Sequence, residues 1–281
     1  MAEAAGEGRA VQAVVPAAGE GTRMRPLTAD RPKGLVEVAG QPLLAHVFDA
    51  LRPVARECVV VVGYRGDQIL DRFGSTYRGL DLTYVRQPER RGLADALLRA
   101  EPHVDGDVIS LNGDNVLRTD LGDLVARHRE TGADVTALVE RVSPERARKG
   151  AVFELGGDAS SVTNADDGGR DTHDSDAVAG RETDTAERNR QPITGILEKP
   201  SDPPSTLVPR GCYALSQRVF DACRRVSPGS TGERELTDAI DLMLAAGHRL
   251  ETVPLQGWCH NVNTPADREQ VTRRLGNTGE G

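Results

Sequence analysis

Short apolar runs alternate with segments of helical spacing along most of the chain. The runs whose length and content of Val, Ile and Leu are typical of buried strands are residues 11–16, 58–63, 82–85, 108–114 and 134–139. Apolar residues recur every three or four positions, as in amphipathic helices, over residues 41–51, 67–73, 94–100 and 121–130. Later in the chain, further strand-like segments lie at residues 193–200 and 211–215, and helices are predicted at residues 217–225 and 236–246.

Strands that alternate with helices at this spacing predict an α/β fold. We expect a Rossmann-like, mostly parallel (mixed) central sheet with helices on both faces, in a single domain over residues 11–270. Ligands of such sheets bind beyond the carboxyl ends of the strands. The glycine-rich segment after residue 16 and the carboxylate of Asp114 both fall at strand ends, which predicts one shared site.

Three segments fall outside this pattern. Residues 156–192 are rich in Asp, Gly, Ala, Thr and Ser and contain almost no large apolar residues, so they cannot bury enough surface to order themselves. They are predicted to form a disordered, acidic insertion. Residues 1–10 are predicted to be a disordered N-terminus and residues 271–281 a tail.

The overall charge excludes several classes of partner. With 43 acidic and 35 basic residues the formal net charge is −8, whereas nucleic-acid binding rewards clustered cations. No apolar run approaches the roughly 18–20 residues that span a bilayer, and the first residues lack the basic and apolar regions of a signal peptide. We expect a cytoplasmic protein without nucleic-acid or membrane partners. The 4 scattered cysteines have neither metal-ligand nor disulfide spacing and are expected to be reduced and mostly buried.

Lysine is almost absent from the basic residues. Only Lys33, Lys149 and Lys199 occur, and the other cations are arginines. An acidic surplus with so little lysine indicates a salt-adapted, halophilic surface, although high-GC codon usage would give much the same lysine deficit. A lysine retained against this trend is expected where a compact point charge is needed and a planar guanidinium will not serve.

The segment after the first strand has the features of an anion-binding loop. Residues 16–28 read Pro-Ala-Ala-Gly-Glu-Gly-Thr-Arg-Met-Arg-Pro-Leu-Thr. Gly19 and Gly21 would let backbone N–H groups approach an anion, and Arg23 adds a fixed positive charge. The segment is neither a P-loop nor the dinucleotide GxGxxG motif. A bare glycine loop could equally be a structural turn, but Arg23 followed by Pro32-Lys33 favours an anion site.

These residues resemble the opening signature of the sugar nucleotidylyltransferases, in particular the glucose-1-phosphate thymidylyl- and uridylyltransferases. In that family a Gly-x-Gly-Thr-Arg-Met/Leu-x-Pro-Leu-Thr loop precedes Pro-Lys-x-Leu, and residues 19–28 and 32–35 match both parts. The resemblance implies that Arg23 and Lys33 hold the triphosphate and neutralise charge as its α-phosphate is attacked. The nucleotide-binding residues that it implies are Ala18, Gly19, Gly21, Thr22, Gln87, Gly92 and Asp114.

The segment around Gln87 is similar to the part of the family that binds the base. There a Gln reads the pyrimidine edge, and a helix that begins with glycine, here Gly92, lies beside the base. The form Gly-Leu-Ala at residues 92–94 is more similar to thymidylyltransferases than the Gly-Thr-Ala of many uridylyltransferases. The alternative is a structural helix with a satisfied Gln. The resemblance leaves dTTP and UTP open, because the two bases share one hydrogen-bonding edge.

A metal site is implied at the end of the fourth strand. The family places its metal-binding Asp in a Gly-Asp turn, which Asp114 matches, and carboxylate oxygens suit Mg²⁺. Its second metal ligand is an Asp in a closing Trp-x-Asp-Ile/Val-Gly-Thr-Pro segment. Residues 257–267 resemble that segment, but Asn261 stands at the Asp position. An amide oxygen is a weaker magnesium ligand than a carboxylate, and Asn263 is an alternative to Asn261.

The resemblance also implies a sugar-phosphate site. By it, Gly150 and Glu198 hold sugar hydroxyls and Lys199 binds the sugar phosphate and acts in catalysis, although adjacent residues of a strand face opposite sides. Two of the three lysines fall on family lysine positions. Residues 232–240 resemble a helix start of the family and are interpreted as structural.

The resemblance thus implies an enzyme that joins a nucleoside triphosphate to a sugar-1-phosphate with Mg²⁺ and releases pyrophosphate. The nucleotide half would cover about residues 11–115 and the sugar half about residues 116–264. Two alternatives remain, a non-catalytic regulator that binds sugar nucleotides and a nucleotidylyltransferase with a non-sugar acceptor. Because the family is often oligomeric, a homo-oligomer is expected.

Overall fold

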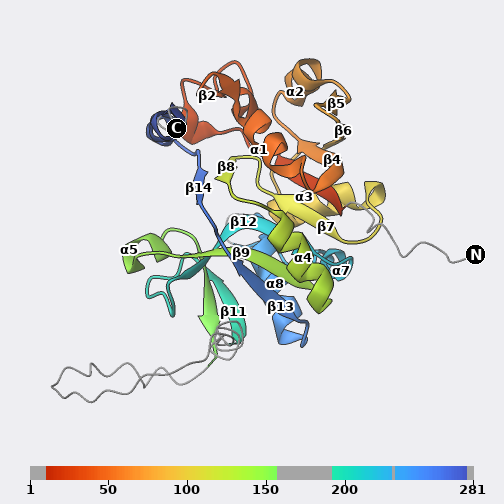
Figure 1. Cartoon of the computed structure of the whole chain (residues 1–281), viewed down its shortest axis with the longest axis vertical. Helices are drawn as coiled ribbons and strands as arrows, with labels where there is room; N and C mark the ends of the chain where they lie inside the picture. Colours follow the sequence, from red (N-terminus) through yellow and green to blue (C-terminus); the bar gives the residue numbers. More distant parts are fainter. Residues whose placement is uncertain (1–10, 157–191, 230–231, 277–281) are drawn as a thin grey trace, which may run out of the picture.

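The structure is a computed structural model that describes residues 11–156, 192–229 and 232–276. Its central sheet is formed by β1 (Val11–Ala17), β4 (Ala55–Val62), β5 (Thr76–Tyr77), β6 (Leu80–Arg86), β7 (Val108–Leu111), β9 (Val135–Arg141), β12 (Leu207–Leu215) and β13 (Leu250–Pro254). These eight strands lie in the order β13-β9-β12-β7-β1-β4-β6-β5. Only β12 and β5 run antiparallel to their neighbours, so the predicted mixed, mostly parallel sheet is confirmed (Figure 1).

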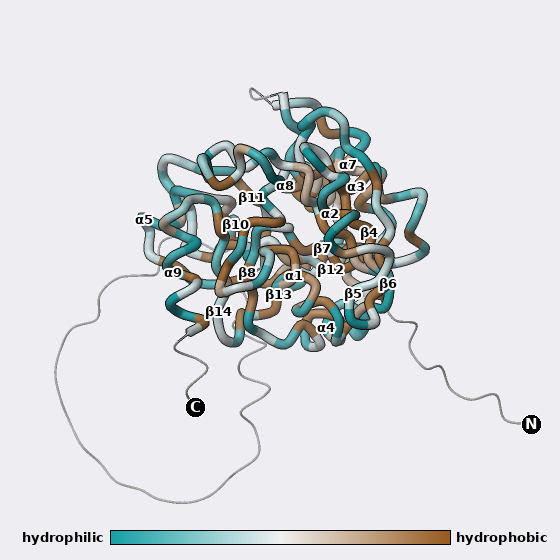
Figure 2. The backbone as a smooth tube through the Cα atoms, turned by 90° about the horizontal axis from the view of Figure 1, so that it is seen from above, coloured by the Kyte–Doolittle hydropathy of each residue, from teal (hydrophilic) through white to brown (hydrophobic). Residues whose placement is uncertain are grey.

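Helices cover both faces of this sheet, as predicted. One face carries α1 (Leu43–Leu51), α2 (Gly66–Phe73) and α4 (Gly122–Thr131). The other carries α3 (Leu93–Ala100), α7 (Arg218–Arg225) and α8 (Leu236–Ala245). Strands covered on both faces read as continuous apolar runs, which explains the Val-rich segments of the sequence. Figure 2 shows the apolar positions along the central strands and the polar ones around the outside.

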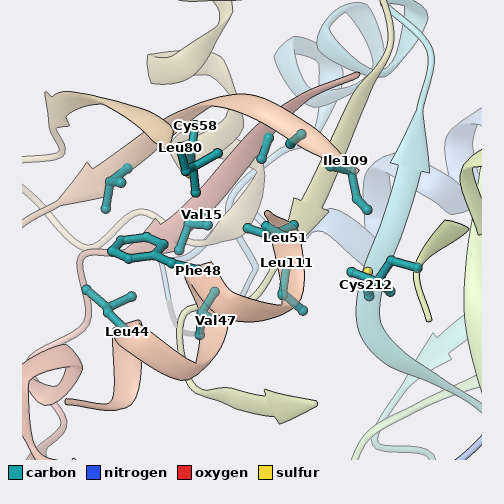
Figure 3. Packing of buried hydrophobic residues seen from close by; sticks show 14 of the residues in the cluster. Val15, Leu44, Val47, Phe48, Leu51, Cys58, Leu80, Ile109, Leu111 and Cys212 are labelled. Atoms are coloured by element: carbon teal, nitrogen blue, oxygen red, sulfur yellow. The ribbon is translucent and has the colours of Figure 1, made fainter. Parts of the chain in front are cut away.

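One of the two main cores lies between the sheet and α1, α2 and α4. Phe48 and Leu51 of α1 lie against Val15 of β1 and Leu111 of β7 (Figure 3). Phe48 also meets the Phe73 ring edge-on, at 5.1 Å between centroids. Both helical spacing in the sequence and burial in the structure therefore identify the same face of α1. All four cysteines are free and buried, as expected.

Most of the short paired strands were missed by the sequence patterns because they span too few residues to show a period. The exception is β11 (Ile193–Glu198), which the strand-like segment at residues 193–200 predicted. The short antiparallel pairs are β2 (Glu37–Val38) with β3 (Gln41–Pro42), β8 (Asn115–Arg118) with β14 (Trp258–Asn261), and β10 (Ala151–Leu155) with β11 (Ile193–Glu198). The remaining helices are η1 (Thr22–Met24), η2 (Lys33–Leu35), η3 (Glu101–His103), α5 (Pro144–Ala147) and α9 (Pro265–Gly276).

Two predicted boundaries are corrected by these elements. The helix predicted from residue 41 begins at Leu43, because Gln41 and Pro42 pair with β2. The strand predicted over residues 108–114 ends at Leu111, since the chain turns over the next three residues to form the site described below.

The C-terminal helix also corrects the predicted tail. α9 runs to Gly276, past the domain end expected at residue 270, because Val271 is buried and Leu275 packs beside it. β14 and α9 carry the chain back from the lower half of Figure 1 to the vicinity of β2. This return brings residues 261–264 to the N-terminal half of the molecule.

The predicted disordered segments lie mostly outside the described residues, which exclude 1–10, 157–191, 230–231 and 277–281. The insertion predicted at 156–192 joins the ends of β10 and β11, where the Gly156 N–H donates to the Pro192 carbonyl at 2.7 Å. No helix within the described ranges is long and apolar enough to span a bilayer.

Candidate active site

Two adjoining cavities open at the carboxyl ends of the parallel strands, where the α/β pattern predicts a ligand site. One has a volume of about 350 Å³ and is lined mainly by residues from the N-terminal half. The other, of about 540 Å³, is lined mainly by residues between 142 and 151, by β12, by the start of α8 and by residues between 260 and 267. They share Arg23, Leu93, Asn112 and Glu235. We call them the nucleotide-side and sugar-side cavities.

The glycine loop after β1 forms one wall of the nucleotide-side cavity. Ala18 and Gly19 line it, and no atom lies within 4 Å of where a Cβ on Gly19 would stand, so a ligand can approach its backbone. Gly21 has φ 66°, and a Cβ there would lie 2.9 Å from the Lys33 Cβ. Gly21 therefore brings the loop against Lys33. Thr22 begins η1 and is exposed.

Lys33 lies between two oxygens at the junction of the cavities. Its Nζ is 2.9 Å from Asp114 Oδ2 and 2.8 Å from Asn263 Oδ1. The same Asn263 oxygen accepts a hydrogen bond of 3.1 Å from Arg23 Nη2. Because an ammonium can donate to separate acceptors around a compact centre, the retained lysine suits this position better than a planar guanidinium.

The turn that carries Asp114 is fixed to the sheet by its backbone. The Gly113 N–H donates to the Pro16 carbonyl of β1 at 3.0 Å, and a Cβ on Gly113 would lie 2.7 Å from that oxygen. The Asn112 N–H donates to the Gly211 carbonyl of β12 at 2.9 Å. Glycine is thus required where the turn crosses β1, and Asp114 is held beside the glycine loop.

Asn263 is positioned by the segment between β14 and α9. The Val262 N–H donates to the Asp114 carbonyl at 2.8 Å, which places this segment beside the turn that carries Asp114. Asp267 Oδ2 accepts hydrogen bonds from the N–H groups of Asn263 and Thr264, at 3.0 and 2.8 Å. Thr264 Oγ1 in turn accepts from the Asp267 N–H at 3.2 Å, so the two residues form a reciprocal cap on α9.

This cap predicts an acid-sensitive contribution to stability. Burial acts to raise the pKa of Asp267, but hydrogen bonds from Thr264 and from backbone N–H groups outweigh it and lower the pKa below its ordinary value. A carboxyl group whose pKa is lower in the folded than in the unfolded protein stabilises the fold at pH values above the unfolded pKa. This stabilisation is lost as the pH falls through the pKa of the folded protein. We expect Asp267→Asn to lower the free energy of unfolding by about 1 kcal/mol near pH 7.

Urea denaturation of both proteins from about pH 7 down to about pH 3 measures this effect. The difference between wild type and Asp267→Asn should narrow as Asp267 becomes protonated. A difference that stays constant over the whole range would contradict a role for the carboxylate charge.

Gln87 also lines the nucleotide-side cavity and directly follows β6. Its amide nitrogen Nε2 donates to the Gly92 carbonyl at 3.1 Å and to Asp95 Oδ2 at 2.8 Å. Gly92 has φ 89°, and a Cβ there would lie 2.3 Å from the Arg234 carbonyl, so only glycine allows this start of α3. The predicted base-binding residues are therefore brought together.

The sugar-side cavity contains some of the predicted sugar-phosphate residues. Gly150 and Glu198 line it, whereas Lys199 does not. The Lys199 side chain is 66% exposed and pairs with Glu198 at 3.2 Å, and its N–H donates to the Gly150 carbonyl at 3.0 Å. Lys199 also has φ 46°, an unusual backbone conformation that recurs at functional sites. Asn261 lines the same cavity.

Several lining residues were missed by the sequence patterns. Lys149 lines the sugar-side cavity beside Gly150, so each of the three lysines lies in or next to the site. The scarcity of lysine was a signal that could have identified it. The segment 232–240, interpreted as structural, contributes Glu233 and Glu235 to the nucleotide-side cavity. Burial, reinforced by the neighbouring carboxylates, raises the pKa of Glu235.

A larger depression, of about 920 Å³, lies along β13 and shares no lining residue with these two cavities. Its cations include Arg127 and Arg249, which pair with Glu251 at 2.8 and 2.7 Å. None of the predicted site residues borders it. The predicted site residues that line one of these three cavities therefore all line the smaller, adjoining pair.

Comparison with known proteins agrees with this arrangement. The model of the nucleotidyl transferase family matches residues 12–163 and 181–262. The chain belongs to the nucleotidyl transferase family. The resemblance drawn from the opening signature is thereby confirmed, and this nucleotidyl transferase has the fold expected for it.

Two relatives come from Haloferax volcanii. This nucleotidyl transferase is 41% identical, over 94% of its length and 96% of the relative, to the UTP–glucose-1-phosphate uridylyltransferase AglF. It is 30% identical to the low-salt glycan biosynthesis nucleotidyltransferase Agl11, over 92% of its length and 64% of that protein. A solved UDP-glucose pyrophosphorylase in complex with UDP-glucose matches with a TM-score of 0.77 at 18% identity, covering 95% of this chain and 99% of that one. At that identity, the structural match shows a common fold.

Proposed function

We propose that this nucleotidyl transferase transfers a uridylyl group from UTP to glucose-1-phosphate and releases pyrophosphate. The observation that carries the proposal is the convergence of Arg23, Lys33, Asp114 and Asn263 at the junction of two cavities. The named activity of the relative that is 41% identical supports UTP and glucose-1-phosphate as the substrates. dTTP is the alternative donor, because thymine presents the same edge as uracil.

The reaction needs charge neutralisation and positioning more than acid–base chemistry. A phosphate oxygen of the sugar-1-phosphate attacks the α-phosphorus of UTP, and the bond from that phosphorus to the bridging oxygen of the leaving pyrophosphate breaks. The attacking oxygen is already ionised near neutral pH, so no general base is needed. Arg23 borders both cavities and would contact both substrates, while Lys33 would stabilise the charge that develops at the α-phosphate.

On the sugar side, Gly150, Glu198 and Glu235 would hold the sugar hydroxyls. Lys149 and Lys199 are the lysines available to the sugar phosphate. Lys149 pairs with Glu145 at 3.2 Å, and both lysine side chains are about two-thirds exposed, so each is free to reorient when an anion enters. The proposal retains Lys199 as a phosphate ligand and adds Lys149.

Mg²⁺ is the cofactor that fits this chemistry, and Asp114 and Asn263 would hold it. Their oxygens already lie 2.9 and 2.8 Å from a single cation, the Lys33 ammonium, and carboxylate and amide oxygens are hard donors of the kind Mg²⁺ takes. The ion would supply charge neutralisation for the phosphates. No cluster of three or more His, Cys, Asp or Glu in the described ranges could hold a metal, which fits a site completed by substrate phosphates. We therefore favour Asn263 over Asn261 as the second ligand.

Pyrophosphate release tests the proposed function. Wild-type protein in concentrated KCl with Mg²⁺ and glucose-1-phosphate is offered UTP, dTTP, CTP, GTP and ATP in parallel. We expect release with UTP, weaker or equal release with dTTP, and little with the others, because one methyl group gives only modest discrimination. Nucleotide binding without turnover, with glucose-1-phosphate and with a panel of other sugar phosphates, would instead indicate a regulatory sugar-nucleotide-binding protein.

A further inference from the structure

The Gln87 amide is held in one orientation by two acceptors. The residue is 5% exposed, and its side-chain nitrogen Nε2 donates to the Gly92 carbonyl at 3.1 Å and to Asp95 Oδ2 at 2.8 Å. Its backbone N–H also donates to the Val62 carbonyl of β4 at 2.8 Å, so the main chain is fixed as well. Rotating the amide by half a turn would place its oxygen against two other oxygens, which is repulsive.

Asp95 is the stronger of the two constraints. It lies on the first turn of α3, is 5% exposed, and is acceptor-only as a carboxylate, so it can bind only the N–H side of the amide. Its other partner is Arg99, one helical turn away, at 3.6 Å. Within the part of the chain that the structure describes, no donor reaches Gln87 Oε1. That oxygen is not sealed from solvent, and Gln87 lines the cavity.

The cavity that Gln87 lines offers apolar side chains on which a flat ring can pack. Ala17, Ala18, Leu93 and Ala96 line the same cavity as Gln87, and the charged Arg90, Glu233 and Glu235 also border it. Lys33 and Asp114 line it where Lys33 reaches Asn263 of the sugar side. A nucleotide with its phosphates at the junction would therefore place its base beside Gln87. The base would meet a fixed hydrogen-bond acceptor.

We propose that Asp95 is a positioning residue that locks the Gln87 carbonyl oxygen toward the base, and so selects bases that present an imide N–H. This inference rests on the proposed function of the site. Uracil and thymine carry an N–H between two carbonyl groups and can donate to Gln87 Oε1. Cytosine has an acceptor nitrogen at that position. A lone pair of this nitrogen would face a lone pair of Gln87 Oε1, which is repulsive. The lock rejects cytosine by electrostatics and not by size.

The test compares UTP and CTP in wild type and Asp95→Asn. An asparagine offers both an N–H donor and an oxygen, so the Gln87 amide can bind it in either orientation, with only the Gly92 carbonyl still favouring the original one. The ratio of kcat/KM for UTP to that for CTP should fall by about tenfold or more, the scale set by one unsatisfied buried polar group. A merely structural role of Asp95 would lower both values together and leave the ratio unchanged.

Two further variants keep the result interpretable. Arg99→Gln removes the other partner of Asp95 without touching Gln87 and should leave the ratio as in wild type. If Asp95→Asn fails to fold, Asp95→Ser removes the carboxylate with a smaller side chain and should lower the ratio in the same way. An unchanged ratio in a folded Asp95 variant would overturn the proposal.

A binding measurement separates this inference from the proposed function. Calorimetric titration of UTP and CTP into each variant gives the same discrimination ratio without turnover. If wild type binds UTP over CTP and Asp95→Asn does not, the lock holds even when no sugar phosphate is converted. Equal affinity of wild type for UTP and CTP would overturn it, whatever the activity.

Discussion

Lys33→Gln should lower kcat by about a hundredfold to a thousandfold while the protein remains folded. Lys33 is 14% exposed and is the cation that Asp114 and Asn263 share. In a site of this kind a preorganised charge stabilises the developing negative charge far more than it would in water. A glutamine can donate to one of the two oxygens but carries no charge, so the effect should appear in kcat, with a smaller change in the KM for UTP. Steady-state kinetics over both substrates measure the two separately.

Lys33→Arg is the matched control for charge. Arginine keeps the positive charge but has a planar fork, and Gly21 packs close to the Lys33 side chain, which leaves little room for it. We expect Lys33→Arg to recover less than about a tenth of the wild-type kcat, since misplacement by about 1 Å can cost a hundredfold. Near-wild-type activity of the arginine variant would show that charge alone suffices. It would also remove the explanation for a lysine at this position in an arginine-rich chain.

The fold could be predicted from the sequence where burial follows a regular period. β1 and β4 are covered on both faces, so they appear as continuous apolar runs, and α1 places its apolar residues on one face. β8, β10 and β14 are too short to show such a period and were missed, whereas β11 was predicted within residues 193–200. α9 was missed because only Val271 is buried in it, which leaves a mostly polar helix without an apolar stripe.

The site residues that belong to a local sequence motif could be predicted. The glycine loop, Lys33 and Asp114 were identified from local sequence, and the structure brings them together. Asn263 reaches Lys33 only because β14 and α9 return the chain to the N-terminal half, a contact between residues 230 positions apart. No local pattern encodes such a contact.

Asp95 could not have been selected from the sequence either. An Asp in the first turn of a helix is stabilised by the helix dipole, so its presence there needs no ligand to explain it. Its hydrogen bond to Gln87 became visible only in three dimensions. Lys149 is different, because the rule that identified Lys33 and Lys199 applied equally to it.

Asp114→Ala should abolish measurable turnover, with a loss in kcat of about a thousandfold or more, because it removes the only carboxylate that we assign to Mg²⁺. The same variant should lose Mn²⁺ binding in titrations followed by electron paramagnetic resonance, a readout that does not depend on turnover. Alanine variants of Asn263 and Asn261 then show which of the two is the second Mg²⁺ ligand. Asn263→Ala should weaken Mn²⁺ binding by about tenfold to a hundredfold.

Asn261→Ala is the matched control, because it removes the same amide two positions earlier in the chain. Asn261 lines the sugar-side cavity, so its loss should raise the KM for glucose-1-phosphate and leave Mn²⁺ affinity near that of wild type. Asn263→Asp should strengthen Mn²⁺ binding, since a carboxylate is a better ligand than an amide oxygen for a hard cation. If Asn261→Ala weakens Mn²⁺ binding more than Asn263→Ala does, Asn261 is the ligand, and the hydrogen bond from Lys33 to Asn263 serves only to hold the lysine in place.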